Sequence, residues 1–177
     1  MFFASCDKID NLTSEEIELG EVSIDIPVDF NSPSTLKSAN EFVSFSGQSL
    51  PLNLQSSMFQ KIQDYNVSSI VFIVTDVKIK ITTTGESGTT VKDFTSNTTG
   101  AGNVFSYKKE GNINLGVEFG DTKLTDYMKS IFAAIQSNKT VIVDVAGQTD
   151  IDPSKISEGE ITVVTMIPTL KAKIKFI

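Results

Sequence analysis

The nearest approach to a cluster of chemically active side chains is a group of three aspartates, Asp144, Asp150 and Asp152. Carboxylates can bind calcium or transfer protons, but calcium needs roughly six or more oxygen ligands at defined positions. Two of these aspartates flank Ile151 and are followed by Pro153, which does not fit an EF-hand loop. We therefore expect an Asp-rich turn, with no bound metal or cofactor.

The composition removes the commonest catalytic groups. Among 177 residues there is no histidine and only one cysteine. Ser–His–Asp catalysis, Cys–His catalysis and an ordinary zinc site are therefore excluded. The sequence also contains no P-loop and no G-x-S-x-G nucleophile elbow. We expect a protein that is not an enzyme, and an enzyme using carboxylates and hydroxyls alone is the remaining catalytic alternative.

The charge distribution argues against nucleic acid as a partner. The net charge is −7, and no segment concentrates lysine and arginine as binding to a phosphate backbone requires. Five lysines alternate with apolar residues and form a predicted exposed basic face: Lys78, Lys80, Lys171, Lys173 and Lys175. Charges on the solvent side of a strand discourage edge-to-edge aggregation, which is our interpretation of these lysines. A weak anion-binding surface is the alternative, and it requires the two strands to be neighbours.

The single cysteine follows two small residues in the segment Phe3-Ala4-Ser5-Cys6. This segment resembles the lipobox of bacterial lipoproteins, in which the cysteine is acylated after the signal peptide is cleaved. The resemblance covers four residues. It implies that a lipid on Cys6 anchors the chain at a bacterial outer membrane or cell surface. If Met1 is instead the true start, we expect a cytoplasmic protein.

Acidic residues dominate the stretch after Cys6. They are Asp7, Asp10, Glu15, Glu16, Glu18 and Glu21, against one base, Lys8. A polar acidic run with few large apolar groups buries too little surface to fold, so it predicts a solvated tether. The run also resembles the surface-export signal of Bacteroidetes lipoproteins. We divide the chain into a lipobox remnant with its tether, residues 1–20, and a single β-sandwich domain, residues 21–177.

From Glu21 onward the hydrophobic period is mostly two, which is typical of strands with one buried face. The alternating segments lie around residues 22–30, 70–81, 113–119 and 141–145, with shorter strands expected at 42–45 and 50–54. Residues 161–167 and 170–176 predict two further strands, with Pro168 between them. A change of phase near Thr75 and Asp76 predicts a β-bulge there. Pro27 lacks a ladder N–H and predicts an edge position for its strand.

Two helices interrupt the predicted strands. Apolar residues at i, i+3, i+4, i+7 and i+8 from Leu124 predict an amphipathic helix over about residues 121–137. Asp121 or Thr122 can cap its start, and Asn138 is expected to stop it. A shorter helix is expected near residues 57–64, with Phe59 and Ile62 turned inward. Together these patterns predict a mainly β fold, an antiparallel β-sandwich closed by the long helix. A β-barrel around a ligand is the alternative.

Residues 82–102 are rich in Thr, Ser and Gly and predict a long hairpin or a flexible surface loop. Loops on a rigid scaffold commonly carry binding residues. We therefore define a candidate binding loop by Thr82, Gly85, Gly88, Val91, Phe94, Gly100 and Gly102.

The sequence indicates a location in the cell more readily than a ligand. We expect a non-catalytic binding or accessory module, lipid-anchored outside a bacterial cell. Its expected partners are the membrane, through the lipid, and a protein or glycan. The alternative is a carrier of an apolar ligand, which requires an internal cavity lined by Phe and Ile beside the helix. No domain family is recognisable from the motifs.

Overall fold

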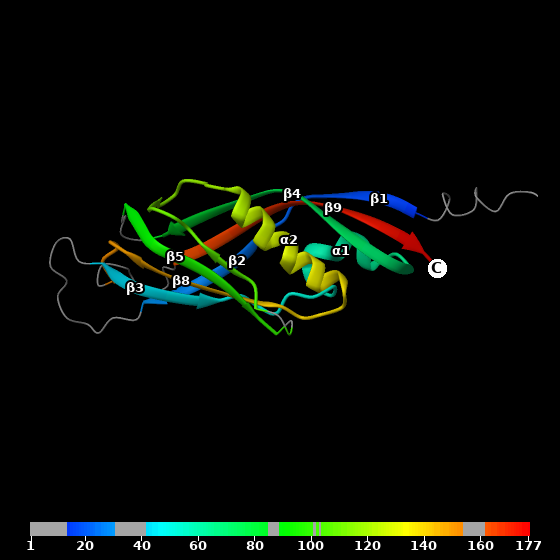
Figure 1. The fold of residues 1–177 in the computed structure, drawn as a ribbon, viewed down its shortest axis with the longest axis horizontal. Helices are drawn as coiled ribbons and strands as arrows, with labels where there is room; N and C mark the ends of the chain where they lie inside the picture. The colour runs from blue at the N-terminus through cyan, green and yellow to red at the C-terminus, as the bar shows by residue number, and fades with distance from the viewer. Residues whose placement is uncertain (1–13, 31–41, 85–88, 101, 103, 154–161) are drawn as a thin grey trace, which may run out of the picture.

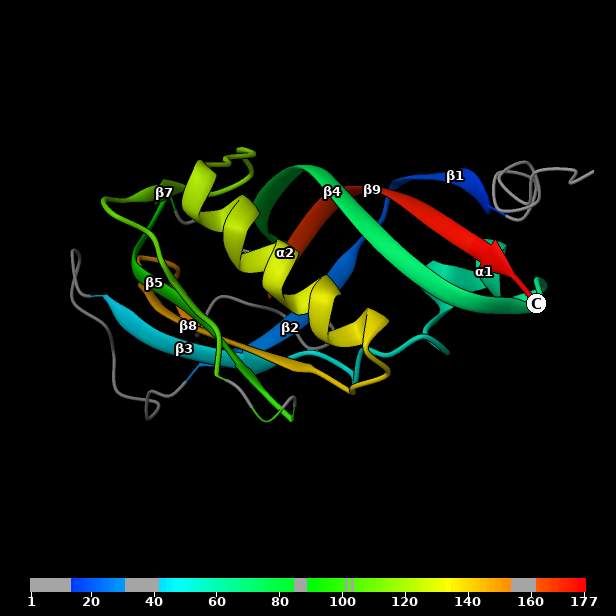
Figure 2. The same ribbon diagram turned by 45° about the vertical axis from the view of Figure 1, so that its right-hand side comes forward.

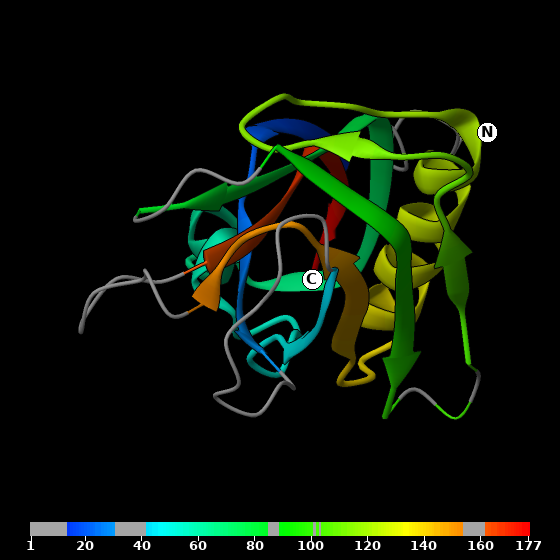
Figure 3. The same ribbon diagram turned by 90° about the vertical axis from the view of Figure 1, so that its left-hand side faces the viewer.

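The computed structural model describes residues 14–30, 42–84, 89–100, 102, 104–153 and 162–177. In this part of the chain, nine strands form one antiparallel sheet that curls into a half-barrel (Figures 1 and 3). The long helix lies along the inner, concave side of the sheet (Figure 2). The predictions of a mainly β antiparallel fold, one amphipathic helix and a short helix near residues 57–64 are confirmed.

The sheet has the strand order β1-β9-β2-β3-β8-β5-β6, with β4 added to β9 and β7 added to β5. The strands are β1 (Ser14–Glu21), β2 (Ile24–Phe30), β3 (Val43–Gln48), β4 (Val67–Thr83), β5 (Thr90–Thr99), β6 (Ser106–Lys108), β7 (Ile113–Asn114), β8 (Ile142–Thr149) and β9 (Thr162–Phe176). The helices are α1 (Gln60–Gln63), which continues a 3-10 turn over Ser57–Phe59, and α2 (Thr122–Gln136).

Strand β9 is paired along both of its edges. On one edge it pairs with β4 over almost its whole length, and on the other with β1 and then β2 in succession. Its side chains alternate: Val164, Met166, Leu170, Ala172 and Ile174 are fully buried, Pro168 is buried in phase with them, and the odd-numbered residues point outward. This strict alternation places one face of β9 in the core and the other in solvent.

Pro168 lies within β9, where the pattern around it predicted a break between two strands. Its ring nitrogen cannot donate to a ladder. The neighbouring strands are irregular at the same level: β4 has a register shift between Val74 and Asp76, and β1 gives way to β2 just after Glu21. The β-bulge predicted near Thr75 and Asp76 is therefore present, and these irregularities let one long strand accommodate the proline.

Helix α2 fills the concave face of the sheet. Leu124, Met128, Ile131, Phe132 and Ile135 are fully buried along one side of it. The helix begins at the predicted cap, where the Asp121 side chain accepts a hydrogen bond from the Leu124 N–H at 2.8 Å. After it ends, Asn138 adopts a positive φ of 60°, as expected of a residue that stops a helix.

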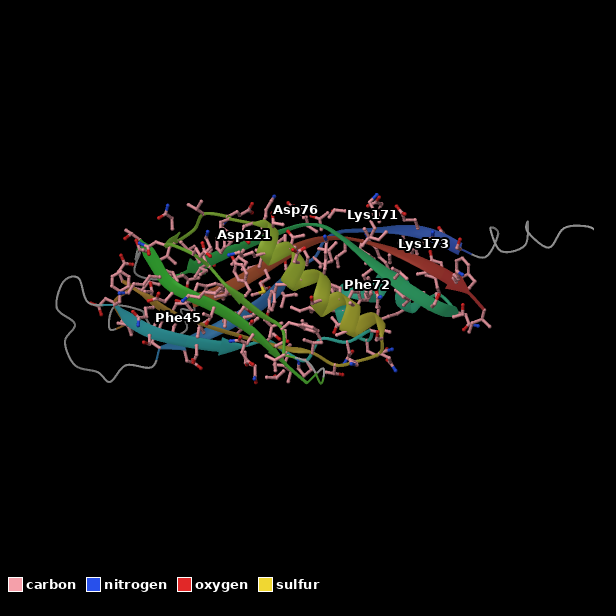
Figure 4. The ribbon with its side chains drawn as sticks, in the orientation of Figure 1. Phe45, Phe72, Asp76, Asp121, Lys171 and Lys173 are labelled. Carbon is pink, nitrogen blue, oxygen red and sulfur yellow. The ribbon has the colours of Figure 1, made fainter. Side chains whose placement is uncertain are left out.

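Three aromatic rings join the long helix, the short helix and β4. The Phe59 ring stacks on Phe72 with centroids 4.8 Å apart, and Phe132 meets both rings edge-on at 6.0 and 5.5 Å. Figure 4 shows Phe72 directed toward helix α2. Such pairs add to the free energy of burying the rings, so this cluster ties one end of the half-barrel together.

Residues 14–20, which the sequence assigned to the tether, form most of strand β1 instead. Glu18 lies opposite Lys171, Glu16 lies opposite Lys173, and Leu19 is buried in the core. Two of the acidic side chains that argued against folding, Glu16 and Glu18, thus lie opposite lysines of β9, which reduces their mutual repulsion. The remaining tether residues, 1–13, lie outside the described residues.

Three other strand predictions need correction. Leu50–Leu54 makes only an isolated bridge, Leu52 with Val141, and Leu50 is 81% exposed. Only Ile113–Asn114 of the predicted strand 113–119 is a strand, because the chain turns at Gly116 with φ 75°. Strand β2 is not an edge strand over its whole length, because it pairs with β9 from Ile24 to Val28 and with β3 from Val28 to Phe30. Pro27 itself is paired on the β9 side only.

The aromatic cluster gives the first prediction. Phe132→Ala should lower the free energy of unfolding by about 3–5 kcal/mol, because it removes a fully buried ring and leaves a cavity. Urea denaturation followed by circular dichroism measures this change. Lys129→Ala, on the exposed side of the same helix, is the control and should change stability by less than about 0.5 kcal/mol. An equal loss in both variants would contradict the packing described here.

Candidate functional site

The outer face of the sheet carries a shallow polar trough of about 450 Å³. Strands β2, β3, β8 and β5 each contribute to it, and they are consecutive in the sheet. The trough is lined by Asp29, Ser46, Gly47, Gln48, Asn97, Asp144, Val145 and Ala146. Apart from Val145, its lining consists of short residues and of side chains that form hydrogen bonds.

One wall of the trough is a row of three polar side chains on adjacent strands. Asp144 of β8 lies between its Cα partners Gln48 of β3 and Asn97 of β5. The Gln48 side chain donates a hydrogen bond from Nε2 to Asp144 Oδ1 at 2.8 Å. A carboxylate flanked by two amides presents both donors and acceptors to a ligand.

The floor of the trough is made of small residues. Ser46 lies opposite Ala146 across the β3–β8 pair, with Gly47 beside Ser46. A Cβ at Gly47 would stand 2.4 Å from the Pro27 carbonyl oxygen, so close packing of β2 on β3 requires glycine there. Because the floor residues have short side chains, a ligand in the trough could approach the backbone closely.

A second cleft, of about 510 Å³, opens where helix α2 begins. It brings together Asp76, Glu118, Asp121 and Asp126, and Figure 4 shows Asp76 and Asp121 near the start of the helix. Three of these carboxylates have structural partners. Asp121 caps the helix and accepts from the Tyr107 hydroxyl at 2.8 Å, Glu118 pairs with Lys78 at 3.6 Å, and Asp126 pairs with Lys129 at 3.8 Å.

Two tyrosines beside this cleft are held in their neutral form. Burial and the Asp121 carboxylate together raise the pKa of Tyr107 well above its ordinary value. Burial likewise raises the pKa of Tyr127 to about 12, against the opposing effect of its hydrogen bond with Ser96 at 2.8 Å. Neither hydroxyl is therefore poised to act as a base near neutral pH.

The predicted exposed basic face does lie on one surface, because β4 and β9 are neighbours. Lys171 and Lys173 project outward there (Figure 4). However, hydrogen bonds to Glu18 at 2.6 Å and to Glu16 at 3.3 Å raise the pKa of Lys171, and Lys78 lies 3.8 Å from Glu21. The acidic residues of β1 thus neutralise much of this surface, which does not favour an anion-binding site; Lys80 and Lys175 share the same face.

The candidate binding loop is largely a strand. Val91 and Phe94 of β5 are fully buried in the core, and Thr82 belongs to β4, opposite Val163. The interpretation of Val91 and Phe94 as loop residues was therefore wrong. Every second residue near the end of β5 faces inward, but two of these inward residues, Ser96 and Thr98, are polar, so the sequence shows no hydrophobic alternation there. Gly100 and Gly102 are exposed at positive φ, and Gly85 and Gly88 lie outside the described residues.

The three aspartates do not act together. Asp144 lines the trough, while Asp150 accepts hydrogen bonds from the Thr89 hydroxyl at 2.5 Å and from the Thr89 and Thr90 N–H groups at 2.9 Å. Within the described ranges, no group of three or more His, Cys, Asp or Glu residues could hold a metal ion.

An apolar pocket of about 170 Å³ lies beside the short helix α1. It is lined by Leu54, Gln55, Phe59, Ile62, Gln63, Tyr65, Val67 and Ile70. Its aromatic and branched residues match the chemistry expected for the carrier alternative, but its volume is below the roughly 300 Å³ at which small-molecule sites begin.

Comparison with protein-family models, with curated proteins and with solved structures finds no match to this chain. Among the helices that the structure describes, none is both long enough and apolar enough to cross a membrane.

Asp150 gives the second prediction. Although partial burial opposes ionisation, the hydrogen bonds from Thr89 and Thr90 outweigh it and lower the pKa of Asp150. Asp150→Asn should therefore lower the free energy of unfolding by about 1–2 kcal/mol at pH 7, because it removes a charged acceptor.

The loss of unfolding free energy caused by Asp150→Asn should be larger at neutral pH than at acidic pH. Because the pKa of Asp150 is lower in the folded state than in the unfolded state, where it is about 3.9, the ionised carboxylate stabilises the fold at pH values above about 3.9. This stabilisation is lost as the pH falls through the pKa of the folded state. The gap between wild type and Asp150→Asn in urea denaturation should thus narrow below about pH 4. Asp64→Asn, at an exposed carboxylate, is the control and should unfold like wild type at each pH. A stability difference between wild type and Asp150→Asn that stays constant with pH would contradict the lowered pKa of Asp150.

Proposed function

We propose that this chain is a non-catalytic binding module, held outside a bacterial cell by a lipid on Cys6. The lipobox-like segment Phe3-Ala4-Ser5-Cys6 supports the anchor. The observation that carries the binding role is the division of the sheet into a filled inner face and an outer face with a polar trough. Since α2 occupies the inner face, the outer face is the one available for recognition.

The position of β1 supports an orientation in which the trough faces away from the membrane. Strand β1 lies at one end of the long axis, and β3, β8 and β5 lie toward the other (Figure 1). The chain from Cys6 to the first residue of β1 spans at most about 28 Å. An anchor at Cys6 would therefore hold the β1 end near the membrane and present the trough away from it.

A carrier of an apolar ligand is the second candidate, and the pocket between Phe59, Ile62 and Ile70 is the observation in its favour. At about 170 Å³ it would admit only a small apolar group. A carboxylate-only enzyme is less well supported, because three of the four carboxylates in the cleft at α2 already cap the helix or pair with lysines.

The third prediction tests the anchor. When the full-length gene is expressed in its native host, the N-terminal peptide should begin at Cys6 and carry a diacylglyceryl or triacyl mass. Cys6→Ser should move the protein from the membrane fraction to the soluble fraction. Its thermal unfolding should not change, because the substitution leaves every residue of the described sheet, Ser14 onward, as it is.

Surface exposure is tested on the same cells. Protease added to intact cells should degrade the wild-type protein if it is displayed on the surface, and only after permeabilisation if it faces the periplasm. Ser5→Ala, which keeps a small residue before the cysteine, is the control and should remain acylated. An unmodified chain that begins at Met1 in the soluble fraction would remove the anchored module from consideration.

A further inference from the structure

We propose that the trough on the outer face binds an uncharged, hydroxyl-rich chain, namely an oligosaccharide. This inference rests on the proposed function as a binding module and names the chemistry of its ligand. It follows from how the donors and acceptors around Asp144 are arranged, from the small residues below them, and from the charges at the trough.

The wall of the trough matches the edge of a sugar ring. Gln48, Asp144 and Asn97 lie side by side on three adjacent strands, which are spaced by roughly 4.8 Å. Neighbouring hydroxyls on a sugar each donate one hydrogen bond and accept others. An ionised carboxylate only accepts, whereas an amide does both, so the row offers complementary groups to successive hydroxyls.

The row is held in place and yet open to a ligand. The Gln48 amide occupies Asp144 Oδ1 at 2.8 Å and so orients the carboxylate. Among the described residues, no hydrogen bond is made to Asp144 Oδ2 or by the Asn97 side chain. With respect to the described residues these groups are open to a ligand, and a hydroxyl-bearing ligand could bond them in place of water.

The floor lets such a chain lie flat. Ser46 and Ala146 have short side chains that project little above the sheet, and Gly47 contributes only its backbone, since a Cβ there would point toward the buried Ile26 and Val28. Longer side chains would fill this space, as they do on the neighbouring part of the same face, where Lys92 lies over the Phe42 ring at 4.1 Å. The trough is therefore a local depression in an otherwise ordinary strand surface.

The two carboxylates that line the trough disfavour an anionic ligand and make a cationic peptide the main alternative to a neutral one. Asp29 and Asp144 both line the trough, so an anionic ligand would be repelled. A cationic peptide would be attracted to the same two carboxylates and is therefore the competing ligand, which the salt dependence of binding distinguishes from a neutral one. A neutral polyol satisfies both amides and carboxylates, which is why we favour it.

The affinity should be weak. None of the described residues that line the trough is aromatic and could stack on a sugar, and the hydrogen bonds form on an exposed face. We expect a dissociation constant on the order of 1 mM for a short oligosaccharide. A polysaccharide that offers many copies of its repeat would be retained more strongly.

The fourth prediction is tested by native gel electrophoresis of the purified full chain. The gels contain dextran, mixed-linkage β-glucan, galactomannan or arabinoxylan, and parallel gels contain polylysine. At least one neutral polysaccharide should retard the protein, and raising the salt concentration should leave that retardation unchanged because no charge pairing is involved.

Two pairs of variants locate the binding. Ala146→Leu fills the floor, and Gln148→Leu adds the same side chain at an outward position of β8 outside the trough. Asp144→Ala removes the central acceptor, and Asp126→Ala removes an exposed carboxylate on α2. The trough variants should bind about tenfold more weakly or not at all. The two controls should bind like wild type, and unchanged thermal unfolding should show that all four variants are folded.

Three results would overturn the proposal. They are no retardation by any of the neutral polysaccharides, equal retardation of the trough variants and their controls, or retardation by polylysine alone that disappears in salt. None of these bears on acylation. A lipid on Cys6 without polysaccharide binding would thus overturn only this inference, and binding by a chain that is never acylated would overturn only the anchor.

Discussion

The pairing of β9 along both edges is the interaction on which the rest of the sheet depends. Strand β4 occupies one edge and β1 and β2 share the other, so the chain's last strand joins its first two to its longest. This arrangement needs contacts between residues more than a hundred positions apart. It also fixes the path of β2, and through β2 it fixes β3, β8 and β5, on which the trough is built.

The curl of the sheet and the packing of α2 assign different roles to its two faces. Among the described residues, helix α2 and the Phe59, Phe72 and Phe132 rings pack into one hydrophobic core on the inner face. Even the polar groups inside serve the fold, as the Ser96–Tyr127 and Tyr107–Asp121 hydrogen bonds show. In the proposed function, recognition therefore falls to the outer face, where strand order rather than loop structure brings the polar residues together.

The sequence predicts the local features of this fold well, because they depend on neighbours a few residues away. Short segments of the sequence are enough to predict three of these features: the two-residue period of β9, the change of phase at Thr75 and Asp76, and the Asp121 cap. The trough is different. Gln48, Asp144 and Asn97 each appear in the sequence as an ordinary outward polar residue, and only the order β3-β8-β5 brings them together. That order comes from long-range pairing, which periodicity does not encode. Likewise, Val91 and Phe94 looked like loop residues because alternating Thr and Ser can line either a loop or a strand.

The structure changes the interpretation of the acidic residues that follow Cys6. In isolation the run from Asp7 to Glu21 resembles both a tether and an export signal. Glu16 and Glu18 are now explained by cross-strand pairing with the lysines of β9, and Glu21 by its contact with Lys78. Exposed pairs of this kind contribute little to stability, but they make a charged β1 compatible with the sheet. Those glutamates therefore no longer support export, and that part of the argument rests on Asp7 and Asp10, which precede the first strand. Substituting these two aspartates, and not the glutamates, would separate a role in export from a role in folding.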